Sequence, residues 1–298
     1  MLMNVQDIGR DRAAPPSTPV IISPAAKLTP PSLPRADGAF SIVATEVLAG
    51  FRSWPVWTLL GWDDIRQRYR RSVLGPFWIT LSMGVFVFLL GVIYGRLFHT
   101  ELKSYLPYLS VGFIVWGFIA AVANDSCMAF HESSRIIKQI KLPYSVYILR
   151  VVWRNLIVFL HNIIIFVPIA IIFKVVPNLT TLLALPGLFL VCVNVTWVAM
   201  LLAILSTRYR DMVPIVATIV QIMIFATPIM WPVSSLGGAD IIADVNPVYH
   251  LIELVRAPML GTTPELRSWL VAGSLAIVGS ALATTLLVRK SKRIVFWL

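Results

Sequence analysis

Apolar runs of about twenty residues recur along the sequence and constrain its fold more than any other feature. A run of that length, wound as an α-helix with a rise of ~1.5 Å per residue, matches the ~30 Å hydrocarbon layer of a bilayer. Strands of a membrane barrel would be roughly ten residues long and would alternate polar with apolar side chains, and these runs do neither. We therefore predict membrane-spanning helices at 76–94, 105–123, 146–173, 182–205, 212–231 and 269–288.

The composition also indicates a polytopic helical membrane protein. Of the 298 residues, 58% are apolar and 13% are charged, whereas soluble domains are usually about 25% charged. No internal repeat is visible, so the sequence does not favour an inverted-repeat transporter. The predicted fold class is an all-α membrane protein with six transmembrane helices, an N-terminal amphipathic interface helix and a re-entrant helical segment between spans five and six.

Composition divides the chain into four regions. Residues 1–37 hold seven of the twenty prolines and are predicted to form a disordered cytoplasmic tail, because such polar segments bury little apolar surface. They lack the continuous apolar stretch and cleavage site of a signal peptide. The other regions are a cytoplasmic segment with the interface helix at 38–75, the six-span domain at 76–288 and a basic cytoplasmic C-terminus at 289–298.

Lysine and arginine are distributed unevenly between the two sides of the predicted bundle. Twenty lie on the side that carries both termini and five lie on the other. Because loops rich in Lys and Arg stay in the cytoplasm, we expect a multi-pass protein of the cytoplasmic (inner) membrane with both termini in the cytoplasm.

The densest positive charge lies just before the first span, in "GWDDIRQRYRRSVLGP". Its apolar side chains recur at three- and four-residue steps while the charged ones lie elsewhere around the helix, which is typical of an amphipathic helix in the membrane interface. The acidic pair at 63–64 suits a helix N-terminus, and Gly75-Pro76 would break the helix. Alternatively, the cluster is only a topology anchor that attracts anionic lipid. The residues assigned to the interface helix are Trp62, Ile65, Arg66, Arg68, Tyr69, Arg70 and Arg71.

Several stretches resemble one transporter family, in order, between residues 61 and 288. They are "DDIRQRYRRSVLGPFWITL", "SSRIIKQIKLPYSVYILRVVWRNL", "STRYRDM", "IMIFATPIMWPV" and "NPVYHLIELVRAPMLG". They resemble the permeases of polysaccharide-exporting ABC transporters, the membrane subunits that export O-antigen, capsule or teichoic acid chains. The resemblance implies a permease for a lipid-linked polysaccharide, with O-antigen ranked first, capsular polysaccharide second and teichoic acid lower. A type-2 ABC exporter of drugs or lipids shares the six-span plan and stays an alternative.

The resemblance also implies a division of labour between subunits. ATP and Mg would bind a separate nucleotide-binding ATPase subunit, and two copies of it would work with a homodimer of this chain. The sequence agrees, since it has no G-x-x-x-x-G-K-[ST] phosphate loop. The predicted spans contain no Asp or Glu, which disfavours coupling to ions. We predict no catalytic, cofactor-binding or metal residue on this chain; besides the ATPase and the polymer, its expected contacts are membrane lipids and not nucleic acid.

A membrane-embedded glycosyl- or acyltransferase is the rival prediction from the enzyme class. It would need a general base or metal-binding carboxylates at an interface. The acidic candidates on the cytoplasmic side are Asp63, Asp64, Asp125 and Glu132, with His131 beside them. Three other reactive residues have simpler roles. His161 is expected to hydrogen-bond a neighbouring helix, and Cys127 and Cys192 to pack as small apolar residues.

The resemblance places the contact with the ATPase subunit in the loop between spans two and three, at 131–141. The segment "ESSRIIKQIKLP" can form a short helix, with Ser133 or Ser134 as cap, isoleucines along one side and Pro143 as its end. An ordinary basic loop is the alternative. The residues assigned to coupling are Ser134, Arg135, Ile136, Ile137 and Lys138.

A polymer path through the bilayer requires a surface that suits both sugar C–H faces and water, and aromatic rings provide one. In the family, spans one and five line the path. Side chains at four-residue steps in span one and near one side of span five are therefore assigned to the channel, and Pro228 is expected to kink span five. Alternatively, these aromatic rings face lipid or other helices. The assigned residues are Trp78, Ser82, Phe86, Gln221, Phe225 and Trp231.

The outward loop at 233–267 contains a short helical pattern. Asn246-Pro247 can cap and start a helix, Glu253 and Arg256 can pair three residues apart, and Pro258 and Gly261 would end it. Such a helix is too short to cross ~30 Å, and the resemblance implies that 246–260 is re-entrant and closes the outer side of the path. A helix that only anchors the loop in the interface is the alternative. The residues assigned to this outer gate are Asn246, Pro247, Tyr249, Leu251, Ile252, Glu253 and Arg256.

Overall fold

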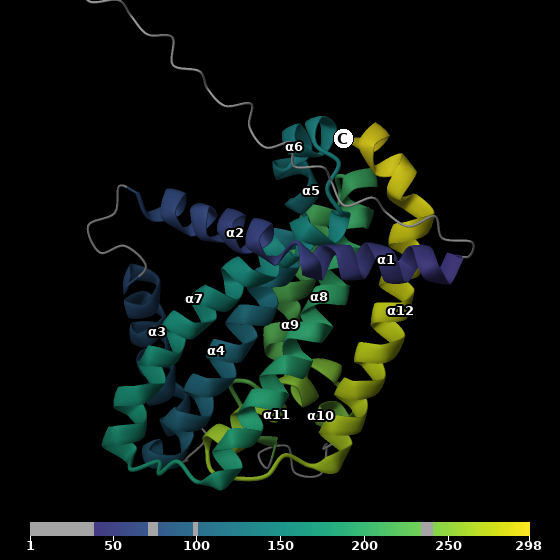
Figure 1. Ribbon diagram of the computed structural model, residues 1–298. Coiled ribbons are helices and arrows are strands. Elements are labelled where there is room, and N and C mark those ends of the chain that lie inside the picture. Colours follow the sequence, from purple (N-terminus) through teal and green to yellow (C-terminus); the bar gives the residue numbers. More distant parts are fainter. Residues whose placement is uncertain (1–38, 71–76, 98–100, 234–240) are drawn as a thin grey trace, which may run out of the picture. The chain divides into compact units, whose positions relative to one another are not determined.

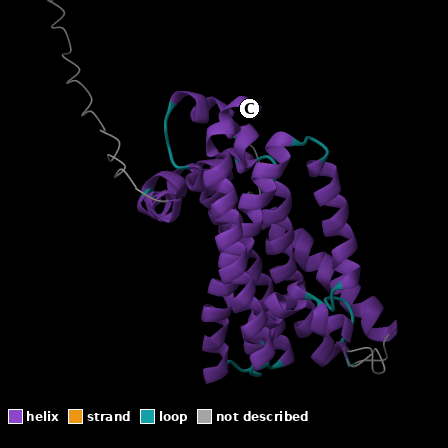
Figure 2. Ribbon diagram, turned by 90° about the vertical axis from the view of Figure 1, so that its right-hand side faces the viewer, coloured by secondary structure: helices purple, strands orange, loops and turns teal. Residues whose placement is uncertain are grey.

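The computed structural model describes residues 39–70, 77–97, 101–233 and 241–298, with the side chains of 39–45 and of Ile79 excepted. Every regular element in these stretches is a helix (Figures 1 and 2). Five of the described helical stretches are long and apolar enough to cross a membrane, which confirms the predicted all-helical membrane fold. They are α3 (Phe77–Leu97), α4 (Leu102–Ser126), α7 (Tyr144–Phe173), α8 (Ala184–Arg208) with the short η1 (Leu179–Leu183) before it, and α12 (Leu266–Trp297).

The segment predicted as the fifth span forms a shorter helix. α9 (Met212–Ala226) has 15 residues, or ~22 Å at ~1.5 Å per residue, which is less than the ~30 Å hydrocarbon layer. Thr227 has an extended backbone, with ψ at 139°, because a residue that precedes proline avoids the helical conformation. The predicted kink at Pro228 is therefore wrong, since the helix ends before it. The count of six spans stays a prediction.

α4 is the central helix of the bundle. Fourteen of its 25 residues are buried, and it packs against α3, α7, α8, α9 and α11. α8 and α12 form a second close pair. A Cβ atom at Gly279 of α12 would lie 2.2 Å from the Trp197 ring of α8, so only glycine allows this approach.

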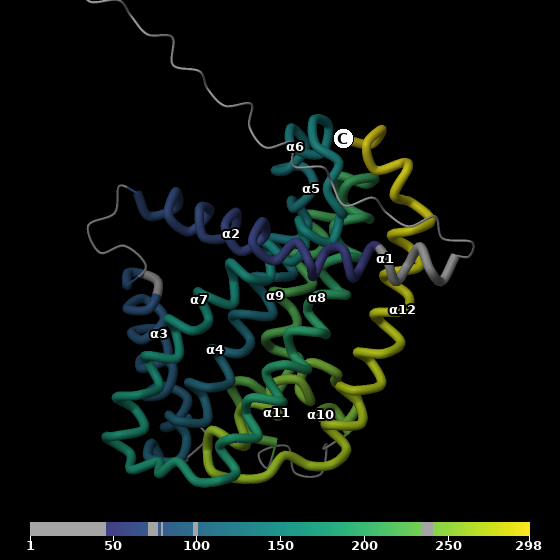
Figure 3. Tube along the Cα trace, viewed as in Figure 1, coloured from purple at the N-terminus to yellow at the C-terminus, as the bar shows by residue number. Residues whose placement is uncertain are grey.

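Short helices gather at both ends of the bundle. α1 (Ala39–Arg52) and α2 (Trp54–Tyr69) run across the end where the C-terminus lies, and α5 (Ala129–Glu132) and α6 (Ser134–Gln139) lie at the same end (Figures 1 and 3). We call this the C-terminal end. The opposite end, called the α11 end, holds η1, α10 (Ile241–Val245) and α11 (Pro247–Met259) (Figure 1). The predicted tail at 1–37 and the predicted break at Gly75-Pro76 lie outside the described residues.

Candidate functional site

A cluster of charged side chains joins three helices near the C-terminal end. Two arginines one turn apart on α7 face α2: Arg150 Nε donates to Asp64 Oδ2 at 2.7 Å, and Arg154 Nη1 donates to the same oxygen at 3.2 Å. Arg154 Nη2 also donates to Asp125 Oδ2 of α4 at 2.7 Å, and Asn155 Nδ2 donates to that oxygen at 3.0 Å. We call these five residues the charged cluster.

The charged cluster fastens α2 to α4 and α7. Only 6% of the Arg154 surface is exposed, so its guanidinium group depends on protein partners instead of water. Removal of one partner from a buried ion pair typically costs ~3–5 kcal/mol, because the other charge is left without compensation. The same geometry weakens the enzyme rival. The carboxylates of Asp64 and Asp125 are both bound by guanidinium groups, and within the described stretches no three His, Cys, Asp or Glu side chains gather to hold a metal ion.

α2 begins earlier than the predicted interface helix. Its first residue is Trp54, after Ser53 and with Pro55 in the first turn, where the N–H group that proline lacks would have no partner within the helix. The acidic pair Asp63 and Asp64 therefore lies in the second half of the helix, and its predicted place at a helix N-terminus is wrong. The Asp64 carboxylate is held instead by the arginines of α7.

The buried face of α2 also differs from the prediction. Ile65 is buried where α2 packs against α7, whereas Trp62 is 54% exposed, so the two do not share one apolar face. Gly61 allows the close crossing, because a Cβ atom there would lie 3.2 Å from the Arg150 carbonyl oxygen. Tyr69 is half-buried. The exposed basic side chains are those of Arg66, Arg68 and Arg70; Arg71 lies outside the described residues.

α1 is attached to the start of α7. The N–H group of Tyr144 donates to Glu46 Oε1 at 2.7 Å, and Ser145 Oγ donates to the Glu46 carbonyl oxygen at 3.1 Å. Burial raises the pKa of Glu46, against the smaller lowering effect of the Tyr144 hydrogen bond. α1 and the first turn of α7 thus form one packed unit.

The predicted coupling segment forms α5 and α6 at the C-terminal end. Ser133 occupies the N-cap position of α6 without a capping side-chain bond, and its Oγ instead accepts from Arg150 Nη1 at 3.3 Å. Ile137 is buried in the core and Ile140 is 54% exposed. α6 ends at Gln139, earlier than the predicted stop at Pro143. Among the residues assigned to coupling, Arg135 and Lys138 are exposed and Ser134 and Ile136 are partly buried.

The predicted channel residues lie on α3, on α9 and just after α9. Both helices pack against α4, and the Phe86 ring meets Phe113 of α4 edge to face, with ring centroids 5.4 Å apart. Trp231 is half-buried, and its Nε1 donates to the Phe225 carbonyl oxygen at 3.2 Å. The exposed members are Trp78, Ser82, Phe86, Gln221 and Phe225. The structure therefore places five of the six on two helices that share α4 as a neighbour, with Trp231 in the segment after α9, and their role in a channel stays a prediction.

α11 has the predicted helix start. Asn246 Oδ1 accepts hydrogen bonds from the N–H groups of Val248 and Tyr249, at 3.0 and 3.3 Å, and Pro247 occupies the first turn. The helix continues through Pro258 to Met259, so Pro258 does not end it, and Gly261 follows with φ at +85°. Eight of the 13 residues are buried, including Leu251 and Ile252. α11 packs against α4, α8 and α12, which favours a segment held in the bundle over a helix on the bilayer surface.

Arg256 of α11 is buried, with 1% of its surface exposed. Its Nε and Nη2 donate to Glu253 Oε2 at 2.9 and 2.6 Å, which confirms the predicted pair. Its Nη1 donates to the Pro228 carbonyl oxygen at 2.9 Å, and its guanidinium carbon lies 3.9 Å from the centroid of the Tyr108 ring of α4. Tyr108 Oη donates to the same Pro228 oxygen at 3.2 Å. We call these four residues the Arg256 cluster.

Two contributors to the Arg256 cluster were missed by the sequence analysis, Tyr108 and the carbonyl group of Pro228. Arg256 and Pro228 are 28 residues apart along the chain, and no local pattern links them. The capping Asn246 also bonds beyond its own helix, since its Nδ2 donates to Thr227 Oγ1 at 3.0 Å. α11 is therefore fixed to the non-helical segment that follows α9.

Comparison with known proteins gives a consistent result. The family model described as "ABC-2 type transporter" matches residues 55–260. Two curated relatives named "O-antigen export system permease protein RfbA", both from Klebsiella pneumoniae, are 25% identical over 169 residues, which is 56% of this chain and 65% of each relative. The chain thus covers just under two thirds of their length. A protein of the same name from Myxococcus xanthus is 23% identical over 202 residues, 65% of this chain and 76% of that relative.

Proposed function

Since this chain belongs to the ABC-2 type transporter family, we propose that it is the membrane permease subunit of an ABC transporter that exports a lipid-linked polysaccharide, O-antigen first among the candidates. The observation that carries the proposal is the family match over residues 55–260, together with three relatives named as O-antigen export permeases. Five long apolar helices agree with a path across a membrane. Its place is the inner membrane, with the C-terminal end of the bundle in the cytoplasm.

ATP hydrolysis occurs on a separate subunit in this proposal. The chain has no phosphate-binding loop sequence, and a symmetric pair of permeases with two ATPase subunits places one path on the dimer axis. ATP and Mg then bind the partner chains. α5 and α6 at the C-terminal end receive the motion of the ATPase, because Arg135 and Lys138 project from α6 and Arg150 ties Ser133 to the charged cluster.

The polymer passes along the face formed by α3 and α9. Two aromatic side chains on these helices are left largely exposed by the described residues, Trp78 at 58% and Phe225 at 63%, and a second copy would complete the wall. α11 closes the outer side of this path, since it is attached to the segment after α9 through Pro228 and Thr227.

Deletion of the gene in its own host tests the proposal. Surface polysaccharide should disappear and lipid-linked polymer should accumulate inside the cell, and expression of the intact chain should restore the surface polymer. Sugar analysis of the lost polymer separates O-antigen from capsule and teichoic acid. If all surface polysaccharides persist in the deletion strain, the proposed function is wrong.

A further inference from the structure

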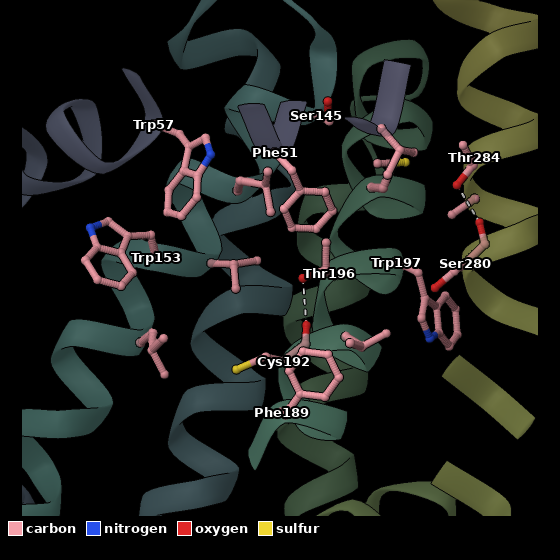
Figure 4. A pocket seen from close by; sticks show the side chains of 17 residues that line it. Phe51, Trp57, Ser145, Trp153, Phe189, Cys192, Thr196, Trp197, Ser280 and Thr284 are labelled. Carbon is pink, nitrogen blue, oxygen red and sulfur yellow. Dashed lines mark hydrogen bonds between the residues drawn. The ribbon is translucent and has the colours of Figure 1, made fainter. Parts of the chain in front are cut away.

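A cavity of about 410 Å³ opens between α1, α2, α7, α8 and α12 (Figure 4). Aromatic rings form much of its wall, from Phe51 of α1, Trp57 of α2, Trp153 of α7 and Phe189 of α8. None of its lining residues comes from α3, α4 or α9. The cavity is therefore separate from the proposed polymer path.

Three hydroxyl groups in the wall are already bonded to backbone carbonyl oxygens. Thr196 Oγ1 and Thr284 Oγ1 each donate, at 2.6 Å, to the carbonyl oxygen four residues earlier on their own helix. Ser145 Oγ donates to the Glu46 carbonyl oxygen at 3.1 Å. An occupant would meet carbon and ring surfaces over most of its length, which suits a hydrocarbon chain.

One buried donor in the wall is unpaired. Trp57 Nε1 is buried and finds no acceptor among the described residues. In Figure 4 this nitrogen lies on the side of the indole ring that faces Phe51, and the ring is held by an edge contact with Trp153, with centroids 5.8 Å apart. A buried donor without a partner typically costs ~1–3 kcal/mol. An occupant with an acceptor at this level of the cavity would remove that cost.

The size of the cavity sets the length of the occupant. An apolar cavity of ~150 Å³ accepts benzene, so a volume of this size holds, in proportion, roughly sixteen carbon atoms. We propose that the cavity binds one acyl chain of a membrane glycerophospholipid, with an ester carbonyl oxygen that accepts a hydrogen bond from Trp57 Nε1.

The charge of the adjoining segments supports this occupant. Basic residues follow lining residues along the chain toward the C-terminal end, where we place the phosphate of such a lipid. Arg52 follows Phe51 on α1, and four more follow Thr284 on α12: Arg289, Lys290, Lys292 and Arg293. None of these five pairs with a described carboxylate. A polyisoprenyl phosphate would satisfy these cations, but it has no carbonyl group for Trp57.

The bound chain would hold α1 and α2 against the bundle, because it fills the space that these helices cover. This role goes beyond polymer export and does not depend on which polymer is carried. Loss of the lipid would then loosen α1 and α2 while the five long helices stay assembled.

The test is a count of bound lipid on the full-length chain. The chain is purified in mild detergent, stripped of lipid and titrated with palmitoyl-oleoyl phosphatidylglycerol, and native mass spectrometry measures occupancy. Cys192→Phe fills the cavity and should lower the affinity of the tightest site about tenfold or more, whereas Leu185→Phe adds a ring on the exposed face of the same helix and should leave it unchanged. Trp57→Phe removes one hydrogen bond and should weaken binding about 3- to 10-fold, with Trp62→Phe as its matched control.

Ala283→Leu fills the same space from α12, so the test stands even if Cys192→Phe does not fold. Equal affinity in the wild-type chain and in a folded cavity-filling variant would overturn the proposal. Tight binding of a polyisoprenyl phosphate, with none of phosphatidylglycerol, would show that the assignment to a glycerophospholipid is wrong.

Discussion

The two ends of the bundle each bury an arginine, and they balance its charge in different ways. In the charged cluster, the arginines of α7 pair with carboxylates on two other helices, Asp64 of α2 and Asp125 of α4. In the Arg256 cluster, the arginine pairs with Glu253 on its own helix, three residues away. Its contacts with the rest of the chain are neutral groups, the Pro228 carbonyl oxygen and the Tyr108 ring.

This difference predicts which end can move. Separation of α2 from α7 would leave unpaired charges on both sides, at the ~3–5 kcal/mol typical of a broken buried pair. Separation of α11 would carry the arginine and its carboxylate away together, so the electrostatic cost at this cluster is only a hydrogen bond and a cation–π contact. We therefore expect α11 to open during transport while α2 stays attached to α7.

The largest effect is expected from Arg154→Met in the charged cluster. The change leaves Asp125 without its guanidinium partner and Asp64 with one of two, and should destabilise the chain by ~3–5 kcal/mol. Thermal melting of the detergent-solubilised chain and its level in membranes measure this loss. Arg68→Met, on the exposed side of α2, is the control and should melt like the wild-type chain. If Arg154→Met and Arg68→Met melt at the same temperature, the charged cluster does not hold α2 against α7.

Arg256→Met should destabilise the chain less than Arg154→Met does. It should, however, have the larger effect on how firmly α11 is held in its closed position. Only one carboxylate, that of Glu253, loses its guanidinium partner, whereas Arg154→Met removes a guanidinium from both Asp64 and Asp125. We expect a loss of about 2–3 kcal/mol from the hydrogen bonds to the charged group and leakage of small solutes through the reconstituted transporter. If Arg256→Met has normal stability and its reconstituted transporter does not leak small solutes, Arg256 does not hold α11 closed.

Substitutions at Tyr108 separate the two neutral contacts of α11. Tyr108→Phe keeps the ring under Arg256 and loses only the hydrogen bond to Pro228, at a cost of ~0.5–1.5 kcal/mol. Tyr108→Leu also loses the cation–π contact and should cost ~1–2 kcal/mol more because the site is desolvated. The measurement is the melting temperature of both variants. Identical values would show that the ring contributes nothing to the attachment.

The smallest stability effect is expected at α6. Arg135→Ala with Lys138→Ala removes two exposed charges and should leave melting unchanged, since exposed substitutions rarely alter stability by more than ~0.5 kcal/mol. Polymer export should nevertheless fall, because these side chains face the proposed ATPase contact. Ile137→Asp is not a comparable test, because Ile137 is buried and its change would unfold the segment. Unimpaired export by the double variant would contradict the assignment of α6 to coupling.

Features that depend on neighbours along the chain were predictable from the sequence. The lengths of the apolar runs predicted the five long helices. Asn246-Pro247 predicted the start of α11, and the spacing of Glu253 and Arg256 predicted their ion pair. Each of these rests on residues one helical turn apart, or on an uninterrupted run.

Features that depend on distant parts of the chain were not predictable. Asp64 and Arg150 are 86 residues apart, and Asp64 was instead assigned to a helix N-terminus. The early end of α9 could have been found, since Thr227 precedes a proline, but the apolar run continues past it and favoured a longer helix. The burial of Ile137 depends on the fold around α6, and the isoleucine pattern alone placed it on the partner-facing side.

Thiol accessibility during turnover tests the proposed motion of α11. In a chain whose Cys127 and Cys192 are replaced by alanine, Ala257→Cys places a thiol on the buried side of α11 and Ile65→Cys places one on the buried side of α2; the native residues are 4% and 6% exposed. Both variants are reconstituted with the ATPase subunit and treated with a maleimide, at rest and during ATP-driven export. Labelling of Ala257→Cys should accelerate at least tenfold during export while Ile65→Cys stays protected. Export at the normal rate with Ala257→Cys still protected, or with Ile65→Cys labelled instead, would contradict the proposed motion of α11.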